Sequence, residues 1–382
     1  MRKLSMTVVA VALTISAPAM AQIKIGVSLA TTGPAASLGI PEKNTIQLLP
    51  KEIAGKTIEW IILDDASDPT AARRNIEKLT TENNVDVIIG TSTTVTTLAT
   101  IEVAARTKTP QVSLAASVRL VQPMDDQRRW IFKMPYNDTL IAERTALSMK
   151  SAGVKTLAII SFNDALGEAL EAEYTKAATR QGIKIVASEK YNATDTSVTA
   201  QAIKVMASRP DGVFIGASST PAALPQIALR DRGYKGTIFQ TTGVITNDFL
   251  RVGGKNVEGA ILPGGPVIVV DQLPANHPSR AVGLEYKRLY EAANGAGSVS
   301  TLGANAYDAW LVVSNALPEA VKKAQPGTVE FRSALRDAIE ATKDLHATHG
   351  IINMNPSDHA GFSIDAPVML TIKDGKFVLA KD

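Results

Sequence analysis

The sequence predicts an α/β protein with two doubly wound lobes that are joined by three hinge crossings of the chain. Strand-like and helix-like segments alternate along most of the 382 residues, which indicates parallel sheets covered by helices on both faces. The chain is also longer than one hydrophobic core usually serves. Its last third contains long helical segments with no strands between them, and such helices must cover a sheet formed earlier in the chain.

The N-terminal segment predicts export from the cytoplasm. Arg2 and Lys3 give a basic start, and residues 6–15 form an apolar run that is too short to cross a bilayer. A small-x-small tripeptide ends at Ala21, so we expect cleavage before Gln22 and a periplasmic mature protein. No lipid anchor is expected, because residue 22 is not Cys. An uncleaved membrane anchor is the alternative, and the short apolar run disfavours it.

The first lobe is predicted from strands and helices that alternate up to residue 136. Residues 24–29 alternate in polarity and are rich in β-formers, and Gly33-Pro34 ends this strand. The same unit then recurs. The expected strands are 24–29, 57–63, 85–89 and 111–114, and the expected helices are 41–53, 70–83 and 95–107.

The second lobe repeats this pattern. Its expected strands are 156–161, 184–189, 212–215 and 236–240, and its expected helices are 138–152, 166–181, 199–207 and 221–232. Three further helices are expected at 278–295, 301–323 and 328–342, and we assign them to the outer layer of the first lobe. A final hairpin, 367–372 and 376–380, turns at Asp374-Gly375 and is assigned to the second lobe.

These assignments define the expected domains. They are a signal peptide at 1–21, a first lobe of 22–136 plus 266–350, and a second lobe of 137–265 plus 351–382. The crossings then fall near Pro135, near 263–266 and near 350–356. Two such sheets leave a cleft at the carboxyl ends of their strands, and a ligand in the cleft can close the lobes.

Composition and motifs exclude several classes of function. There is no cysteine, so disulfides, thiolate metal sites and cysteine nucleophiles are excluded. The formal charge of +3 includes the two basic residues of the signal segment, and the remaining +1 is too small for a nucleic-acid-binding surface. His346, His349 and His359 form a loose cluster, but Gly350 predicts the end of any helix that would align two of them, so no metal is expected. No other cofactor is expected either.

An exported enzyme is the first alternative from another functional class. The sequence contains no G-x-S-x-G nucleophile motif and no phosphate-binding loop. Asp64 and Asp65 are adjacent on a strand, so they point to opposite faces and do not form a catalytic carboxylate pair. We therefore interpret them as residues that order the following turn, and we expect a binding protein without enzymatic activity.

Three segments carry a resemblance to a known family. They are residues 25–34 (Ile-Gly-Val-Ser-Leu-Ala-Thr-Thr-Gly-Pro) with Gly39, Asp64-Asp65 before Asp68-Pro69, and 87–90 (Val-Ile-Ile-Gly) before a Ser/Thr-rich turn. The chain resembles the branched-chain amino-acid type of periplasmic binding protein, the type I substrate receptors of ABC importers. The resemblance implies two doubly wound lobes with three crossings. It also implies a permease and ATPase complex of the inner membrane as partner, and we expect a monomer.

In that family, hydroxyl and backbone N–H groups at two βα turns of the first lobe hold the ligand carboxylate. The matching residues are Thr93, Thr94, Ala115, Ala116 and Ser117. Free N–H groups and the dipole at a helix start also favour an anion there. The alternative is that Thr94 and Ser117 only cap their helices.

The second lobe predicts which carboxylate binds. Family members that bind amino acids hold the ammonium with a tyrosine and an acid, and the matching residues here are Leu166 and Thr242. A buried ammonium without a carboxylate partner would be strongly destabilised, so an α-amino acid is disfavoured. Residues 128–138, which begin Arg-Arg-Trp, resemble the branch that serves aromatic-acid uptake.

The predicted ligand is therefore an aromatic acid of the benzoate, hydroxybenzoate or phenylpropanoid type. Lobe closure would cover it with a largely apolar wall, in which Ser219 or Thr242 would contact a ring substituent. That wall is Leu38, Phe162, Leu166, Ala217, Ser218, Ser219 and Thr242. Two alternatives stay open: an amino acid whose ammonium reaches Asp164, and a sensory role in which the liganded protein binds a membrane receptor.

Overall fold

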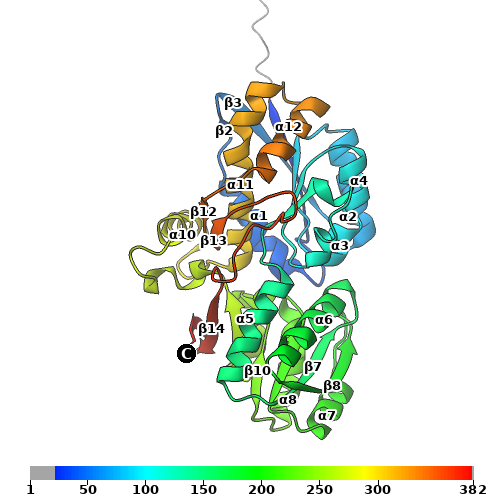
Figure 1. Ribbon diagram of the computed structural model, residues 1–382, viewed down its shortest axis with the longest axis vertical. Helices are drawn as coiled ribbons and strands as arrows, with labels where there is room; N and C mark the ends of the chain where they lie inside the picture. Colours follow the sequence, from blue (N-terminus) through cyan, green and yellow to red (C-terminus); the bar gives the residue numbers. More distant parts are fainter. Residues whose placement is uncertain (1–21, 381–382) are drawn as a thin grey trace, which may run out of the picture.

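The computed structural model describes residues 22–380 and has two lobes stacked along its long axis (Figure 1). The predicted signal peptide, residues 1–21, lies outside the described residues. Within the described part, no helix is both long and apolar enough to span a membrane.

The first lobe, at the top of Figure 1, is built on a six-stranded sheet in the order β2-β3-β1-β4-β5-β6. Its strands are β1 (Ile23–Leu29), β2 (Glu52–Ile53), β3 (Lys56–Asp64), β4 (Val87–Gly90), β5 (Gln111–Ser113) and β6 (Ile131–Lys133). All pairs are parallel except the β2–β3 hairpin. The strand order reverses between β1 and β4, so the loops after these two strands diverge and leave a crevice.

Helices from two distant parts of the chain cover this sheet. The early helices are α1 (Ala36–Leu48), α2 (Pro69–Thr81), α3 (Thr94–Leu98) and α4 (Ile101–Arg106), and the late ones are α10 (Arg280–Asn294), α11 (Thr301–Lys323) and α12 (Val329–Glu340). Helix α11 packs between α1 and α12 and is buried along much of its length. In the structure, α11 and α12 pack together and α11 packs against α1 of the first lobe (Figure 1).

The second lobe repeats the design with a seven-stranded sheet in the order β15-β14-β11-β10-β9-β7-β8. Its strands are β7 (Thr156–Phe162), β8 (Lys184–Tyr191), β9 (Gly212–Gly216), β10 (Thr237–Phe239), β11 (Ile261–Gly264), β14 (Val368–Lys373) and β15 (Lys376–Leu379). Its helices are α5 (Asp138–Ser151), α6 (Ala165–Arg180), α7 (Thr199–Ala207), α8 (Ala223–Asp231) and α9 (Asn247–Gly253). The order reverses between β7 and β9, and the predicted fold of two doubly wound lobes is confirmed.

The first helix differs from its prediction. It begins at Ala36 rather than at residue 41, and Ile53, expected in this helix, belongs to β2. Gly39 explains the early start, because a Cβ there would lie 2.2 Å from the carbonyl oxygen of Ala30 at the end of β1. Only glycine allows the helix to approach the strand so closely, and the sequence period alone does not reveal this contact.

The chain segment after α12 also departs from the predicted domain boundary. It forms a small hairpin of β12 (Leu345–Ala347) and β13 (Gly350–Ile352), and the chain then returns to the first lobe. There Lys133 N donates to His359 O at 3.1 Å, and His359 Nδ1 lies 2.8 Å from Ile131 O. We therefore place the third crossing between residue 362 and β14, instead of near 350–356, where Gly350 and Pro356 suggested a break.

The three histidines that the sequence places in a loose cluster have polar contacts within the protein. His349 is buried, with Nδ1 2.7 Å from Asp308 Oδ2 and Nε2 2.6 Å from Thr301 Oγ1. His359 Nε2 lies 3.1 Å from a carboxylate oxygen of Glu340, and His346 Nδ1 lies 3.1 Å from a backbone carbonyl. The contacts of His349 and His359 hold the segment after α12 against α11 and α12, whereas His346 contacts Pro278, just before α10. Among residues 22–380, no group of three or more potential ligands could hold a metal ion.

Candidate ligand-binding cleft

Two adjoining cavities lie between the lobes, at the carboxyl ends of both sheets. The outer cavity has a volume of about 210 Å³ and is lined by Pro34, Ala35, Ser67, Thr93, Thr94, Val95, Phe162, Asp164, Leu166, Ala193, Thr194, Ser218, Ser219 and Pro221. The inner cavity has a volume of about 50 Å³ and is lined by Leu38, Ser92, Thr93, Thr94, Leu114, Ala115, Ala116, Pro135, Leu166, Ser218, Thr242, Gly243, Thr301, Leu302 and Asn305. The two share Thr93, Thr94, Leu166 and Ser218, so we treat them as one divided cleft.

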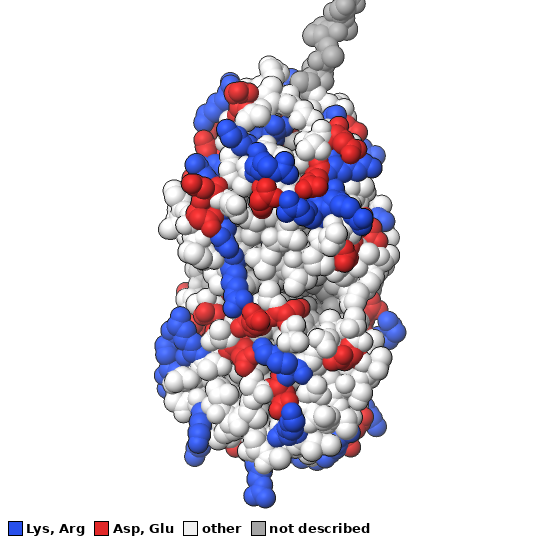
Figure 2. All heavy atoms as spheres, turned by 90° about the vertical axis from the view of Figure 1, so that its right-hand side faces the viewer, with Lys and Arg blue, Asp and Glu red and all other residues white. Residues whose placement is uncertain are grey.

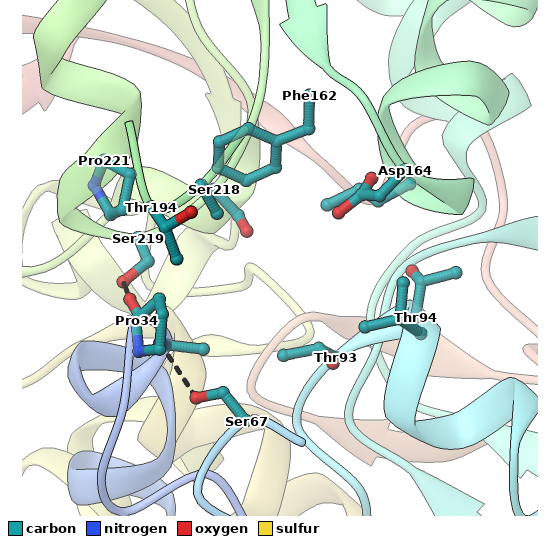
Figure 3. Close-up of a pocket in the computed structure, with 14 residues that line it drawn as sticks. Pro34, Ser67, Thr93, Thr94, Phe162, Asp164, Thr194, Ser218, Ser219 and Pro221 are labelled. Atoms are coloured by element: carbon teal, nitrogen blue, oxygen red, sulfur yellow. Dashed lines mark hydrogen bonds between the residues drawn. The ribbon is translucent and has the colours of Figure 1, made fainter. Parts of the chain in front are cut away.

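Loops at the switch point of each sheet supply most of these side chains. In the first lobe they follow β1, β4 and β5, and in the second they follow β7, β9 and β10. Figure 3 shows Phe162, Asp164 and Ser218 of the second lobe facing Thr93 and Thr94 of the first lobe across an open space. This is the position where open α/β sheets bind ligands.

Most of the predicted site residues line the cleft. Leu38, Ala115, Ala116 and Thr242 line the inner cavity, Phe162 and Ser219 line the outer cavity, and Thr93, Thr94, Leu166 and Ser218 line both. Ser117 and Ala217 line neither. Ser117 is fully buried, and its hydroxyl accepts the N–H of Arg119 at 3.3 Å, which is the capping role that the sequence left as an alternative.

The two neighbouring threonines at the start of α3 differ in their partners. Thr93 caps the helix: its hydroxyl accepts the N–H of Thr96 at 3.3 Å, and its backbone N–H donates to Thr96 Oγ1. Thr94 is only 2% exposed, and its hydroxyl has no hydrogen-bond partner among the described residues. A buried hydroxyl without a partner is costly, so Thr94 is a donor that a ligand in the cleft would satisfy.

At the second predicted carboxylate-binding turn, residues 115–117, some hydrogen-bonding groups already have partners within the protein. The backbone N–H of Ala115 donates to Ser113 Oγ at 3.1 Å, so this donor already has an acceptor. Ser92, which also lines the inner cavity, donates to Glu42 Oε2 at 2.5 Å and accepts the N–H of Ala30. Burial raises the pKa of Glu42 well above its ordinary value. The wall behind Ser92 therefore resists acquiring a negative charge.

Asp164 is the one ionisable side chain in the lining of either cavity among the described residues. Its carboxylate caps α6 by accepting the N–H of Gly167 at 2.9 Å, and burial raises its pKa. No Lys or Arg lines the cleft within the part of the chain that is described, although Figure 2 shows charges of both signs distributed over both lobes. Any anion in the inner cavity would therefore be held by neutral donors.

The lobes touch at the rim of the outer cavity. The Ser219 hydroxyl lies 2.5 Å from Ser37 Oγ and 3.2 Å from the carbonyl oxygen of Pro34, both in the first lobe. Ser219 has a φ of 63° and a ψ of −168°, a conformation that is almost restricted to glycine. Its hydroxyl therefore joins the lobes, whereas the sequence assigned it to a ligand substituent.

Three residues of α11 that line the inner cavity were not predicted: Thr301, Leu302 and Asn305. The sequence assigned this segment to an outer covering layer, because nothing in it marked which turn of the helix would reach the cleft. The one local signal is that Thr301 and Asn305 are four residues apart and therefore lie on one helix face. Asn305 is 4% exposed, and its side-chain oxygen has no partner in the described part of the chain.

Asp65 lies behind the first-lobe loops, and its buried carboxyl should make the free energy of unfolding depend on pH. It is fully buried and accepts hydrogen bonds from Ser28 Oγ at 3.2 Å and Ser67 N at 3.0 Å, and burial raises its pKa to about 6. An unfolded aspartate has a pKa of about 3.9. Between these values the folded protein binds more protons than the unfolded chain, so stability falls as pH rises through this window and is flat above it.

The test compares the wild-type protein with Asp65→Asn by urea unfolding from pH 4 to pH 8. Replacement removes the cost of ionising this carboxyl, so the free energy of unfolding of the variant should exceed that of the wild type at pH 8 by about 2–3 kcal/mol. The difference should shrink as pH falls to 4. Two parallel pH curves would show that Asp65 does not titrate in this window.

The comparisons with known proteins agree with this architecture. The model of the family described as periplasmic binding protein matches residues 22–373. An extracellular ligand-binding receptor from Rhodopseudomonas palustris is 43% identical, with a TM-score of 0.91 over 94% of this chain and 100% of that chain. A search of curated proteins found no match.

Two more distant structures show the same fold. A leucine-binding protein from Thermotoga maritima is 23% identical, with a TM-score of 0.81 over 94% of this chain and 98% of that chain. An ABC-transporter solute-binding protein from Rhodopseudomonas palustris, solved in complex with 4-hydroxybenzoate, is 19% identical, with a TM-score of 0.79 over 94% of this chain and 96% of that chain. The resemblance that the sequence motifs carried is confirmed: the chain belongs to the type I periplasmic binding proteins.

Proposed function

We propose that this protein binds a small aromatic carboxylate in its interlobe cleft and delivers it to the permease of an ABC importer. The observation that carries the proposal is the lining of the inner cavity. It combines the Thr94 hydroxyl, which has no partner among the described residues, with apolar and uncharged polar side chains, and it contains no ionisable side chain. The proposed ligands are benzoate, a hydroxybenzoate or a phenylpropanoid acid.

The lining supports a position for the ligand carboxylate. Asp164 lies in the outer cavity, where a second negative charge would be repelled. The inner cavity offers the Thr94 hydroxyl, and the N–H groups of Thr94 and Val95 in the first turn of α3 have no acceptors within that helix. Hydrogen bonds from neutral donors to a carboxylate are stronger than bonds between neutral groups. We therefore assign the carboxylate to the inner side of Thr94.

The rest of the lining suits an aromatic ring. Phe162 and Leu166 come from the second lobe, and Leu38 and Leu302 come from the first, so an apolar ring between them would be enclosed from both sides. Burial of apolar area stabilises a complex by about 25 cal/mol per Å² before ordering costs. The lobes would then meet over the ligand, as they do at Ser219.

An amino-acid ligand is the second candidate, and the position of Asp164 is what favours it. This carboxylate lines the outer cavity and faces Thr94 across it (Figure 3), so an ammonium group could be paired there. Thr242 lines the inner cavity as predicted, and it supplies a hydroxyl where amino-acid binders carry an acid. The comparisons support both classes, since one related structure is a leucine-binding protein and another holds 4-hydroxybenzoate.

We infer a periplasmic location and a partner complex from the family. Type I members present their ligand-bound, closed form to a membrane protein, which for an importer is the permease with its ATPase. A membrane receptor for signalling is the alternative partner. A screen for binding to permease and receptor proteins encoded near this gene would distinguish the two.

A thermal-shift screen of refolded, ligand-stripped protein tests the ligand class. The ligands are benzoate, the hydroxybenzoates, phenylpropanoid acids, leucine, valine, urea and short amides. A ligand that binds only the folded protein raises the melting temperature in proportion to its occupancy. We expect a rise with at least one aromatic acid and none with leucine or valine. A rise with an amino acid alone would support the alternative ligand and refute the aromatic one.

A further inference from the structure

We propose that Asn305 is a specificity-determining residue that accepts a hydrogen bond from a hydroxyl substituent of the ligand. This inference rests on the proposed function and narrows it from aromatic acids to hydroxylated aromatic acids. The residue lies near the start of α11 and lines the inner cavity together with Leu302 and Thr301.

Asn305 carries, in a buried position, an acceptor that is unpaired within the described part of the chain. The residue is 4% exposed, and its Oδ1 has no hydrogen-bond partner among the residues that the structure describes. Neighbouring polar groups on α11 are satisfied within the protein: the Thr301 hydroxyl is paired with His349 Nε2 at 2.6 Å, and Asp308 accepts hydrogen bonds from Thr348 and His349. A buried unpaired acceptor of this kind needs a donor from elsewhere, and the cavity that it lines is where one can enter.

The unpaired atom is an amide oxygen, which accepts hydrogen bonds. A carboxylate only accepts hydrogen bonds, so it would leave the Asn305 oxygen unsatisfied. A ligand hydroxyl donates one hydrogen bond and accepts another, which matches a carboxamide. Two polar groups of the inner cavity thus have no partner within residues 22–380: Thr94, which can donate to the ligand carboxylate, and Asn305, which can accept from its hydroxyl.

Asn305→Leu and Asn305→Asp test this role. Leucine is similar in size and cannot accept a hydrogen bond, whereas aspartate keeps the acceptor. Titration calorimetry compares benzoate with 2-, 3- and 4-hydroxybenzoate on each protein. We expect the wild-type protein to favour one hydroxybenzoate over benzoate by about tenfold, the typical effect of one buried hydrogen bond. In Asn305→Leu the ratio of the hydroxybenzoate affinity to the benzoate affinity should fall to about one. Asn305→Asp should keep this ratio, although its added carboxylate should weaken the binding of every acid.

The possible outcomes separate this inference from the proposed function. If the wild-type protein binds none of these acids, the proposed function fails, and the inference fails with it. If the acids bind and Asn305→Leu weakens all of them equally, or none, the residue does not select for the hydroxyl and the inference alone is wrong. Loss of the preference in Asn305→Asp as well would show that the amide N–H, rather than the oxygen, contacts the ligand.

Discussion

Replacing Thr94 by valine is expected to lower the affinity for the aromatic acid about 10- to 100-fold. Valine keeps the shape of threonine but removes the hydroxyl, which is buried, lines both cavities and has no partner among the described residues. A hydrogen bond to a charged acceptor contributes about 1.5–3 kcal/mol, which corresponds to that range. Isothermal titration of the purified variant measures the change.

Ser117→Ala is the matched control for Thr94→Val. Both substitutions remove one hydroxyl from the first lobe, but Ser117 accepts a backbone N–H and lines neither cavity. Its removal should reduce stability by about 1 kcal/mol, as for other lost caps, and leave affinity nearly unchanged. Equal losses of affinity in the two variants would show that Ser117 also contributes to ligand binding. No loss in Thr94→Val would show that the carboxylate binds elsewhere.

Gly167→Ala is expected to destabilise the second lobe and to weaken ligand binding together. A Cβ at this position would lie 1.9 Å from the carbonyl oxygen of Phe162 and 2.7 Å from its backbone nitrogen. The backbone must therefore move, and overpacking of this kind typically costs about 1–3 kcal/mol or more. Because the segment from Phe162 to Gly167 also contains the cleft residues Asp164 and Leu166, its displacement should distort the cleft as well.

Thermal unfolding and calorimetry together measure this effect. We expect a melting temperature lower by several degrees and an affinity lower by tenfold or more, since a small misplacement of binding groups has a large effect. Lys176→Ala, on the exposed side of the same helix, is the control and should change neither value. If Gly167→Ala melts and binds like the wild type, the close approach of α6 to β7 does not position the loop.

Sequence patterns predicted the two sheets well for a physical reason. Strands such as β1, β4, β7 and β9 are buried on both faces and are short apolar runs between turn residues, which is a local signal. The boundaries that failed depend on contacts between distant residues. Helix α1 starts early because Gly39 packs against Ala30, and the third crossing is late because His359 packs against Phe132, with ring centroids 4.3 Å apart.

The same distinction applies to the site. The loops after β4, β5 and β7 could be located from the sequence, since a ligand site lies at the carboxyl ends of the strands in such a fold. The role of each polar group could not be predicted, because it depends on whether the protein already supplies a hydrogen-bond partner for that group. Ser117 and Ser219 have partners in the fold, whereas Thr94 and Asn305 have none among the described residues. Nothing in the local sequence distinguishes these two pairs.

We expect the cleft to bind an aromatic carboxylate through uncharged donors. The most direct test is titration calorimetry of the ligand-stripped protein with the best acid from the screen, with its primary amide and with leucine. We predict saturable binding of the acid and no binding of leucine. The amide should bind at least about tenfold more weakly than the acid, because it lacks the carboxylate. Saturable binding of leucine without binding of any aromatic acid would contradict the account and assign Asp164 to an ammonium.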